Sequence, residues 1–461
     1  MHFKFRSLGI VTLSVLVGLM AITTDTHADA LVGLGHVLVN AAAVDGLRGE
    51  GYLHRPPGDA LVVAGEGHAL GVYGFIVVFL VLDGLGGLPD PDTGKTELET
   101  AQIPNLDAIA AAGICGMADP VGPGITPGSG PGHLGVFGYD PVACNIGRGA
   151  LEAVGIDVEL TPGDVAARGN FCTVDTGGII TDRRAGRISS EKGTELCRIL
   201  DNMTFGDITV RAYPVKEHRF VIVFSGPGLV PQVTESDPSR TGYKPLPVEA
   251  ETPEAGKLAN AAQQFIARAG ELLADHHPAN MVLLRGFAGK PDFPSIGEVC
   301  KMKSLAIALY PMYRGLARLV GMEIAQVKGS TVRDEFMTLA EYYNDYDFFF
   351  VHVKWTDSRG EDGNFAGKVA VLEEVDAALP MITNLEPDVL VITGDHSTPA
   401  VYGGHSWHTV PVCIKARYCR TDGVAAFSEP AFITGGLGRI PSSQIMSLAM
   451  ANAGKLTKFG A

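Results

Sequence analysis

The first strongly hydrophobic stretch of the chain outside its N-terminal region is residues 75–82, eight apolar residues in a row. It ends in Asp83-Gly84-Leu85-Gly86, a polar and flexible segment. A continuous apolar run of this length is typical of a parallel strand that is buried on both faces. Ligands in open α/β sheets gather at the carboxyl ends of such strands. Asp83 is therefore placed where a ligand-binding side chain is expected.

Two later apolar runs end in the same way. Residues 348–353 lead into Lys354 and Asp357, and residues 389–393 lead into Gly394-Asp395-His396. Since the carboxyl ends of parallel strands meet at one edge of a sheet, we expect these side chains to lie near Asp83.

Helical patterns separate the predicted strands, and a further short strand is expected at 410–414, directly after His405. The alternation predicts an α/β sandwich with a largely parallel central sheet. The predicted helices cover about 104–113, 305–321, 364–380 and 442–453.

Residues 148–294 follow a different pattern, with polar strands, a short apolar run at 220–224 and a helix near 253–275. We interpret this segment as a smaller inserted α+β domain. The core domain would then consist of residues 75–147 and 295–461.

The N-terminus has the layout of a secretory signal in residues 1–30: a weakly basic start, an apolar run at 8–22 and a small-residue site at Ala28-Asp29-Ala30. Residues 31–74 form an extension that fits no domain. Two interpretations remain open, an export signal or an upstream stretch wrongly included in the gene. The first predicts an exported protein and the second a cytoplasmic one.

The composition is that of a globular protein, with 46% hydrophobic and 19% charged residues in a chain of 461. The formal net charge of −15 argues against nucleic acid and anionic membranes as partners. Seven scattered cysteines without a C-x-x-C pair indicate buried thiols rather than a disulfide framework.

The most informative motif is Thr126-Pro-Gly-Ser-Gly-Pro-Gly-His133, where Ser129 stands among three glycines and two prolines. This composition predicts an open loop with little bulk over the hydroxyl. A serine can act as a nucleophile when a bound metal lowers its pKa. Metal ligands that follow predicted strands are available, namely Asp83, Asp357, Asp395, His396 and His405. A serine with two metal ions indicates phosphoryl transfer or phosphate ester hydrolysis.

From about residue 75 to 455 the chain resembles the archaeal-type, cofactor-independent phosphoglycerate mutases of the alkaline phosphatase superfamily. The resemblance implies an alkaline-phosphatase-like fold, two divalent ions (Mn²⁺ or Mg²⁺), a phosphoglycerate substrate and a phosphoserine intermediate on Ser129. The segments that carry it are Val81–Gly86, Thr126–His133, Phe137-Gly-Tyr-Asp-Pro141, His218-Arg-Phe220 and Thr393-Gly-Asp-His-Ser-Thr-Pro399.

The resemblance also implies two ligand sets. Ser129, Asp83, Asp395 and His396 would surround the metal that activates the serine. The other metal would be held by Asp357, Glu361 and His405. Glu361 stands where the family usually has histidine, and its carboxylate favours hard ions.

Further roles follow from the resemblance for residues that would bind the substrate. Arg148, Arg184 and Arg285 would clamp its phosphate and carboxylate, because the guanidinium fork matches both groups. Asp182 would lie near the glycerate hydroxyl, His133 would contact the phosphate, and Lys354 would neutralise developing charge. His352 and His408 are interpreted as structural.

Two other functions remain open. A metal-dependent phosphatase or phosphonate hydrolase of the same superfamily would share the core, and an export signal would favour it. A non-catalytic phosphate-binding protein would have the fold without turnover. The serine motif argues against that last alternative.

Overall fold

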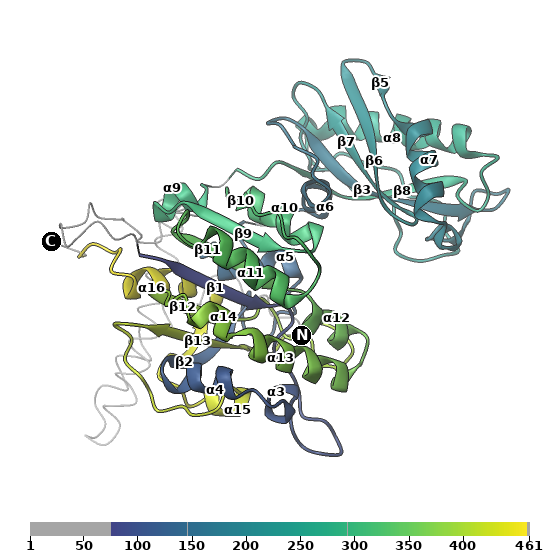
Figure 1. The fold of residues 1–461 in the computed structure, drawn as a ribbon. Helices are drawn as coiled ribbons and strands as arrows, with labels where there is room; N and C mark the ends of the chain where they lie inside the picture. Colours follow the sequence, from purple (N-terminus) through teal and green to yellow (C-terminus); the bar gives the residue numbers. More distant parts are fainter. Residues whose placement is uncertain (1–74, 145, 293, 459–461) are drawn as a thin grey trace, which may run out of the picture. The chain divides into compact units, whose positions relative to one another are not determined.

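The computed structural model describes residues 75–144, 146–292 and 294–458 (Figure 1). The predicted signal segment and the extension, residues 1–74, lie outside the described residues.

A central sheet of eight strands runs in the order β10-β9-β11-β1-β12-β13-β2-β14. In chain order its strands are β1 (Val77–Leu82), β2 (Ile114–Asp119), β9 (Ser304–Ala308), β10 (Glu323–Ile324), β11 (Phe348–Val353), β12 (Val389–Thr393), β13 (Val410–Ala416) and β14 (Gly438–Pro441).

Strand β1 shows why the sheet lies inside the protein. Its six side chains are fully buried and alternate between two hydrophobic cores: Val77, Phe79 and Val81 belong to one, and the residues between and after them to the other. The predicted burial on both faces is therefore confirmed.

Helices cover both faces of this sheet. The first core includes side chains from α5 (Ser129–Val136), α6 (Arg148–Gly155), α10 (Pro311–Leu319) and α16 (Ile445–Asn452). The second core includes side chains from α4 (Pro104–Ala111), α11 (Val332–Tyr342), α13 (Phe365–Ala378) and α14 (Pro380–Thr383).

Strand direction decides which loops meet. Strand β1 is parallel to β11 and β12, and Val81 pairs with both His352 and Thr393. Strand β13 is antiparallel to β12 and to β2. Because β13 runs the opposite way, it begins at the edge where β1, β11 and β12 end. The loop that carries His405, just before β13, therefore reaches the same edge.

A second sheet is antiparallel, with the order β4-β3-β7-β6-β5 and with β8 paired to β3. Helices α7 (Ser190–Leu200) and α8 (Gly256–Leu273) contribute to its core. Its strands are β3 (Val165–Val174), β4 (Ile180–Asp182), β5 (Met203–Phe205), β6 (Ile208–Lys216), β7 (Arg219–Ser225) and β8 (Met281–Gly289).

The helix predicted at 305–321 was wrong in its first part. Residues 304–308 form strand β9, which pairs in parallel with β11, and the helix begins only at Pro311. An apolar run of five residues fits a strand or a helix equally well. Pro311 at the first helical position sets the start of α10. The other predicted core helices are confirmed to within a few residues.

Short helices complete the described chain. They are α3 (Glu97–Thr100), α9 (Ile296–Cys300), α12 (Trp355–Glu361), α15 (Glu429–Phe432), and the 3₁₀ turns η1 (Ala185–Arg187), η2 (Pro253–Ala255) and η3 (Ser442–Gln444).

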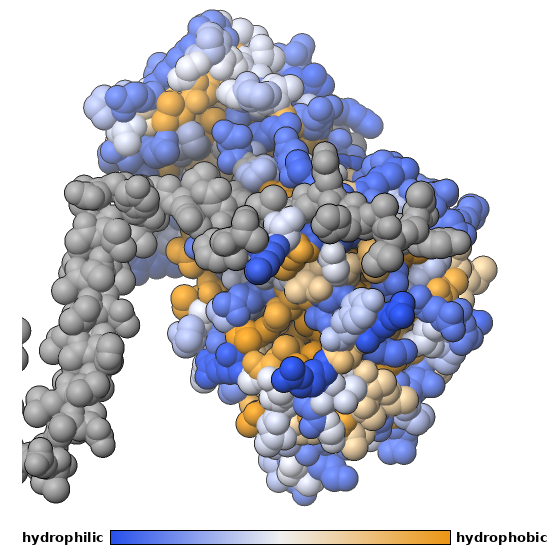
Figure 2. Space-filling model, turned by 90° about the vertical axis from the view of Figure 1, so that its left-hand side faces the viewer, coloured by the Kyte–Doolittle hydropathy of each residue, from blue (hydrophilic) through white to orange (hydrophobic). Residues whose placement is uncertain are grey.

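The fold is thus mixed α/β, with a largely parallel central sheet and an additional antiparallel sheet, and the predicted class is confirmed. On the face drawn in Figure 2, hydrophobic residues form several separate patches among hydrophilic ones. Among the described residues, no helix combines the length and the apolar character that crossing a membrane requires.

Candidate active site

The backbone after β1 and β12 brings two acidic side chains together. The Asp83 N–H donates to the Val353 carbonyl (3.0 Å), and the Gly84 N–H donates to Asp395 Oδ1 (3.1 Å). Gly84 has φ +63°, and a β-carbon there would lie 2.6 Å from Thr398 Oγ1. Only glycine fits this close approach of the two loops without strain.

A first group of potential metal ligands consists of Asp83, Asp395 and His396, whose ligand atoms all lie within 4.8 Å of one another. His396 Nε2 is 3.3 Å from Asp83 Oδ1 and 3.2 Å from Asp395 Oδ2. All three side chains are buried, and two carboxylates stand side by side in this group with cationic or imidazole side chains as nearby partners. Two buried carboxylates at such close range are costly, and a divalent cation would offset their charge. The group therefore fits a metal ion.

Ser129 lies beside this group. Its hydroxyl oxygen is 3.4 Å from His396 Nε2, and its side chain is half-buried. The predicted open loop over 126–133 was wrong after residue 128, because Ser129 is the first residue of helix α5. Pro131 is tolerated there, since the first N–H groups of a helix have no intrahelical partner.

Helix α5 also packs directly on the loop after β12. A β-carbon at Gly132 would lie 2.3 Å from the Asp395 carbonyl oxygen. Gly132 of the serine motif therefore serves a close approach of the helix to Asp395.

A second group of potential ligands consists of Asp357, His396 and His405. His405 Nε2 is 3.5 Å from Asp357 Oδ1, and His396 Nδ1 is 3.9 Å from the same oxygen. His405 Nδ1 is 3.0 Å from the Pro127 carbonyl and donates to it, which leaves Nε2 free to bind a cation. His396 belongs to both groups, one through each ring nitrogen.

Glu361 lies at the margin of this second group. Its Oε1 is 3.7 Å from His405 Nε2, and its side chain is 54% exposed. Helix α12 carries Asp357 and Glu361 one turn apart. Glu361 is not among the three residues whose ligand atoms converge, so a direct metal bond from it remains a prediction.

Lys354 connects the two groups. Its Nζ lies 3.0 Å from Asp83 Oδ2 and also contacts the Asp357 carboxylate. It donates a further hydrogen bond to the hydroxyl of Tyr313 (3.1 Å). A cation that pairs with carboxylates of both groups can offset negative charge on a phosphate.

Charge and burial together fix the protonation states in the site. Burial raises the pKa of Asp83, but His352, Lys354 and His396 outweigh it and hold that pKa well below its usual value. Burial lowers the pKa of Lys354, but Asp83 and Asp357 outweigh it and the net shift is upward. Burial dominates for His396 and lowers its pKa, which keeps the imidazole neutral and able to bind a metal.

His133 is placed differently from the prediction that it contacts the substrate phosphate. Its side chain is fully buried, and Nδ1 lies 3.0 Å from Asp395 Oδ2 and 2.8 Å from the Ser129 carbonyl. Burial lowers its pKa, but Asp395 raises it more, so the net shift is upward. In this structure His133 supports Asp395, and contact with the phosphate remains a prediction.

Two residues of the site were not identified from the sequence. His352, interpreted as structural, lies 3.4 Å from Asp83 Oδ2. Tyr313 was not considered; its ring stacks on His352 with centroids 3.8 Å apart, and its hydroxyl lies beside Asp83 and Ser129. Tyr313 carries no sequence signal, because it lies on the buried face of an ordinary amphipathic helix. The other histidine interpreted as structural, His408, hydrogen-bonds through Nδ1 to Ser406 Oγ (3.0 Å).

The other predicted substrate residues, Arg148, Asp182, Arg184 and Arg285, lie in or next to the second sheet. Among the described residues, no hydrogen bond or ion pair joins these four to the metal-ligand candidates. The Asp182 carboxylate accepts from the N–H groups of Arg184 (2.8 Å) and Gly186 (2.7 Å), so it holds the turn that presents Arg184. Arg285 Nη1 is 3.8 Å from Asp237 Oδ2.

Four arginines gather around Glu152 of helix α6. Arg168 pairs with Glu152 (3.1 Å), and in the strand register it stands opposite Arg285. Burial raises the pKa of Glu152, while Arg168, Arg219, Arg285 and Arg148 lower it less strongly. Arg168 was missed from the sequence, although an arginine inside an apolar strand is a recognisable signal.

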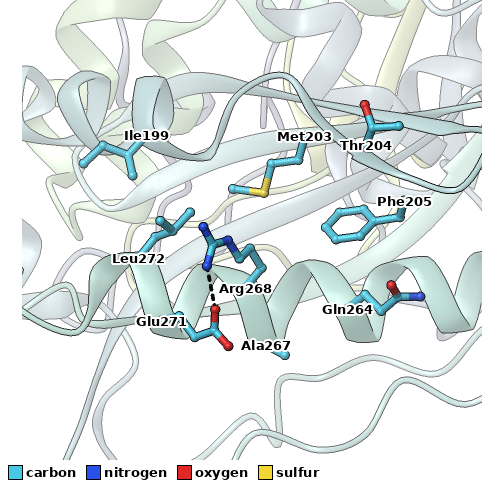
Figure 3. Close-up of a pocket in the computed structure, with 9 residues that line it drawn as sticks. All are labelled: Ile199, Met203, Thr204, Phe205, Gln264, Ala267, Arg268, Glu271 and Leu272. Carbon is cyan, nitrogen blue, oxygen red and sulfur yellow. Dashed lines mark hydrogen bonds and ion pairs between the residues drawn. The ribbon is translucent and has the colours of Figure 1, made fainter.

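A hollow of about 620 Å³ lies elsewhere, between β5 and α8 (Figure 3). Met203 and Phe205 project into it, and its rim carries the ion pair of Arg268 with Glu271 (2.7 Å). None of the predicted site residues lines it, so it is not the site described above.

In this structure a serine at the start of a helix lies beside buried carboxylates and imidazoles at one edge of a mixed sheet. This is the arrangement of an α/β enzyme that transfers phosphoryl groups. The family model for 2,3-bisphosphoglycerate-independent phosphoglycerate mutase matches residues 110–280. The chain belongs to this family, because it is 51% identical to the probable enzyme of that name from Thermotoga petrophila over 387 residues. That match covers 84% of this chain and 96% of the relative.

Other relatives agree. The probable enzyme from Aquifex aeolicus is 47% identical, with 84% of this chain and 97% of the relative covered. The solved cofactor-independent phosphoglycerate mutase from Thermoplasma acidophilum is 31% identical with a TM-score of 0.67, over 82% of this chain and all of that one. A solved Pyrococcus horikoshii protein gives 29% identity and a TM-score of 0.73, over 85% of this chain and all of that one.

Proposed function

We propose that this protein interconverts 2-phosphoglycerate and 3-phosphoglycerate without 2,3-bisphosphoglycerate, through transient phosphorylation of Ser129. The observation that carries the proposal is the Ser129 hydroxyl at the start of α5, 3.4 Å from His396 in the first ligand group. The names of the relatives support the substrate.

In the proposed reaction Ser129 Oγ forms a bond to phosphorus as the bond from phosphorus to the glycerate oxygen breaks. The proton lost by the serine is returned to the departing glycerate oxygen. The glycerate then turns, and its other hydroxyl takes the phosphoryl group from Ser129 by the reverse step. The Tyr313 hydroxyl, which lies beside this serine, and Lys354, which donates to that hydroxyl, would stabilise the charge on the transferring group.

Two divalent ions, Mn²⁺ or Mg²⁺, complete the proposal. Ser129, Asp83, Asp395 and His396 would hold one. Asp357 and His405 would hold the other, with Glu361 at its margin. When bound, such ions lower the pKa of a hydroxyl group and offset phosphate charge.

The arginines around Glu152 would bind the substrate's anionic groups. Arg168 and Arg285 stand opposite each other in adjacent strands, and like charges in that position are unfavourable without an anion. Glu152 is the carboxylate paired with Arg168, and a phosphate or carboxylate would add the missing charge. Arg148 and Arg184 would contribute further contacts.

The two sheets support the proposed domain division. Strands of the central sheet come from residues 75–147 and 295–461, and those of the second sheet from 148–294. We also place the protein in the cytoplasm, where phosphoglycerate is found. Mass spectrometry of the native protein tests this, because a mature chain beginning at Leu31 would instead indicate export.

The direct test uses the full chain with 3-phosphoglycerate and Mn²⁺ or Mg²⁺, in the absence of 2,3-bisphosphoglycerate. We expect formation of 2-phosphoglycerate that stops when a chelator is added. Release of inorganic phosphate without 2-phosphoglycerate would instead identify a phosphatase. If neither product forms, the remaining alternative is a phosphate-binding protein without turnover.

A further inference from the structure

Lys368 is a fully buried lysine that contacts the two loops carrying the first ligand group, and the proposed reaction gives it no role. It lies on α13, and its side chain has no exposed surface. Its Nζ donates three hydrogen bonds to backbone carbonyls: to Gly84 (2.9 Å), Gly86 (3.1 Å) and Thr398 (2.9 Å). Burying an ammonium group is costly unless hydrogen bonds compensate, and these three bonds offset that cost.

The three carbonyls belong to the two loops that carry the first ligand group. Gly84 directly follows Asp83, and Thr398 comes two residues after His396. The loops meet in one more bond, from the Thr398 N–H to the Gly84 carbonyl (3.2 Å). Lys368 therefore joins the loop after β1 to the loop after β12 at the point where their ligands must face one another.

Two carboxylates, Glu97 and Glu429, lie near the ammonium group of Lys368 without a direct hydrogen bond to it. Glu97 Oε1 is 3.8 Å from Lys368 Nζ and accepts from the Ala400 N–H (2.8 Å). Glu429 accepts from the Gly87 N–H (2.8 Å) and the Thr96 hydroxyl (2.7 Å). Both carboxylates thus fix backbone of the same two loops or of the segment next to them.

Three converging carbonyl oxygens with negative charge behind them are what a hard monovalent cation requires of a protein site. An ammonium group and K⁺ are similar in size and charge. Without a cation the three carbonyl dipoles would repel one another in a site closed to water, and the two loops would separate.

We propose that Lys368 is a positioning residue: its ammonium group serves as a built-in monovalent cation that holds the Asp83 loop and the His396 loop in register before any divalent ion binds. The inference rests on the proposed metal groups, not on the identity of the phosphate ester. Replacing the ammonium group should therefore weaken divalent-ion binding, and K⁺ should restore it where space has been left for an ion.

The experiment measures Mn²⁺ binding to the full chain by titration calorimetry, in tetramethylammonium chloride and in KCl at equal ionic strength. For Lys368→Ala in tetramethylammonium chloride we expect the Mn²⁺ dissociation constant to be at least tenfold larger than for wild type. In KCl we expect most of the lost Mn²⁺ affinity to return. The melting temperature of the metal-free variant should also rise in KCl. Wild type and the exposed-site control Lys328→Ala should respond equally to both salts.

Lys368→Met tests the effect of the charge apart from that of the side-chain volume, because methionine fills the site without a charge. We expect weak Mn²⁺ binding in both salts. Wild-type Mn²⁺ affinity in Lys368→Met would overturn the proposal, and so would a loss in a folded Lys368→Ala that K⁺ does not relieve. Because the measurement is Mn²⁺ binding, a wild type that binds Mn²⁺ but lacks mutase activity would contradict the proposed function and not this one.

Discussion

The Ser129 hydroxyl oxygen lies 3.4 Å from Nε2 of His396, the nitrogen that also faces the carboxylates of Asp83 and Asp395. Four side chains with oxygen or nitrogen ligand atoms, from two loops and the start of helix α5, thus lie close together. A nucleophile and its activating ligands are brought together in this way by the sheet edge and by the start of a helix.

Ser129→Ala should lower mutase turnover by roughly a thousandfold or more, because Ser129 Oγ is the hydroxyl that faces His396 Nε2 in the first ligand group and an alanine cannot carry the phosphoryl group. The variant should still fold and bind Mn²⁺, since the carboxylates and imidazoles remain. The rate of conversion of 3-phosphoglycerate measures the effect, with the exposed Ser330→Ala as control. More than a few per cent of wild-type activity in Ser129→Ala would show that the serine is not the nucleophile.

Tyr313→Phe should lower kcat by roughly 10- to 100-fold with little change in KM. The hydroxyl accepts a hydrogen bond from Lys354, and a hydrogen bond to a charged group contributes about 1.5–3 kcal/mol. The ring, which stacks on His352, remains in place. Tyr310→Phe on the exposed end of the same helix is the matched control. Equal kcat values for the two variants would show that the Tyr313 hydroxyl does not contribute to catalysis and that the residue serves only in packing.

Glu361→Ala should raise the Mn²⁺ concentration for half-maximal activity several-fold, because it removes a carboxylate near His405. Glu361→His should keep activity and move the metal preference toward softer ions such as Co²⁺. Activity measured against metal concentration tests both, with Asp362→Ala as the neighbouring exposed control. An unchanged metal requirement would mean that Glu361 is only a solvated acid on a turn.

Arg168→Lys should raise the KM for phosphoglycerate by about tenfold, because the lysine keeps the charge but loses the planar fork that pairs with carboxylate or phosphate. We expect a smaller change in kcat, since Arg168 is assigned to binding. Steady-state kinetics measure both constants, and Arg187→Lys on an exposed turn is the control. An unaltered KM would indicate that Arg168 serves only to pair with Glu152.

His218 gives a pH dependence away from the metal ligands. Burial, and then the charge of Arg219, lower its pKa from the ordinary 6.5 to about 4. An unfolded chain therefore binds this proton at a higher pH than the folded one. The contribution of His218 to stability is complete above about pH 6.5 and is lost as the pH falls toward 4.

An NMR titration measures this pKa directly, and His218→Phe identifies the resonance. Arg219→Gln should shift the pKa upward, toward the ordinary histidine value. A His218 pKa near 6.5 in the wild type would contradict the expected effect of burial and of the neighbouring arginines.

Much of the fold could be predicted because β1, β11 and β12 are continuous apolar runs that end in charged residues. The same pattern predicts that Asp83, Asp357, Asp395 and His396 lie at one edge of the sheet. The strand direction of β13, which brings His405 to that edge, depends on pairing between distant segments and has no local signal.

What could not be predicted depends on contacts across the chain. Lys368 and Tyr313 lie on helices whose sequences are typical of ordinary core packing, and their partners are visible only in three dimensions. The residues over 304–308 fit strand and helix equally well until β11 is seen beside them. Ser129 was expected on an open loop because the motif is rich in glycine and proline like a turn, although Gly132 in fact allows α5 to approach Asp395.

The hydrogen bond from Gly84 to Asp395 joins residues 311 positions apart. During synthesis the segment with Ser129 leaves the ribosome long before Asp357, Asp395 and His405 exist. Pairing across so large a separation is slow, because a long loop must close before the contact forms. An incomplete chain therefore carries the nucleophile without its ligands, and activity should arise only after translation has passed the last of them.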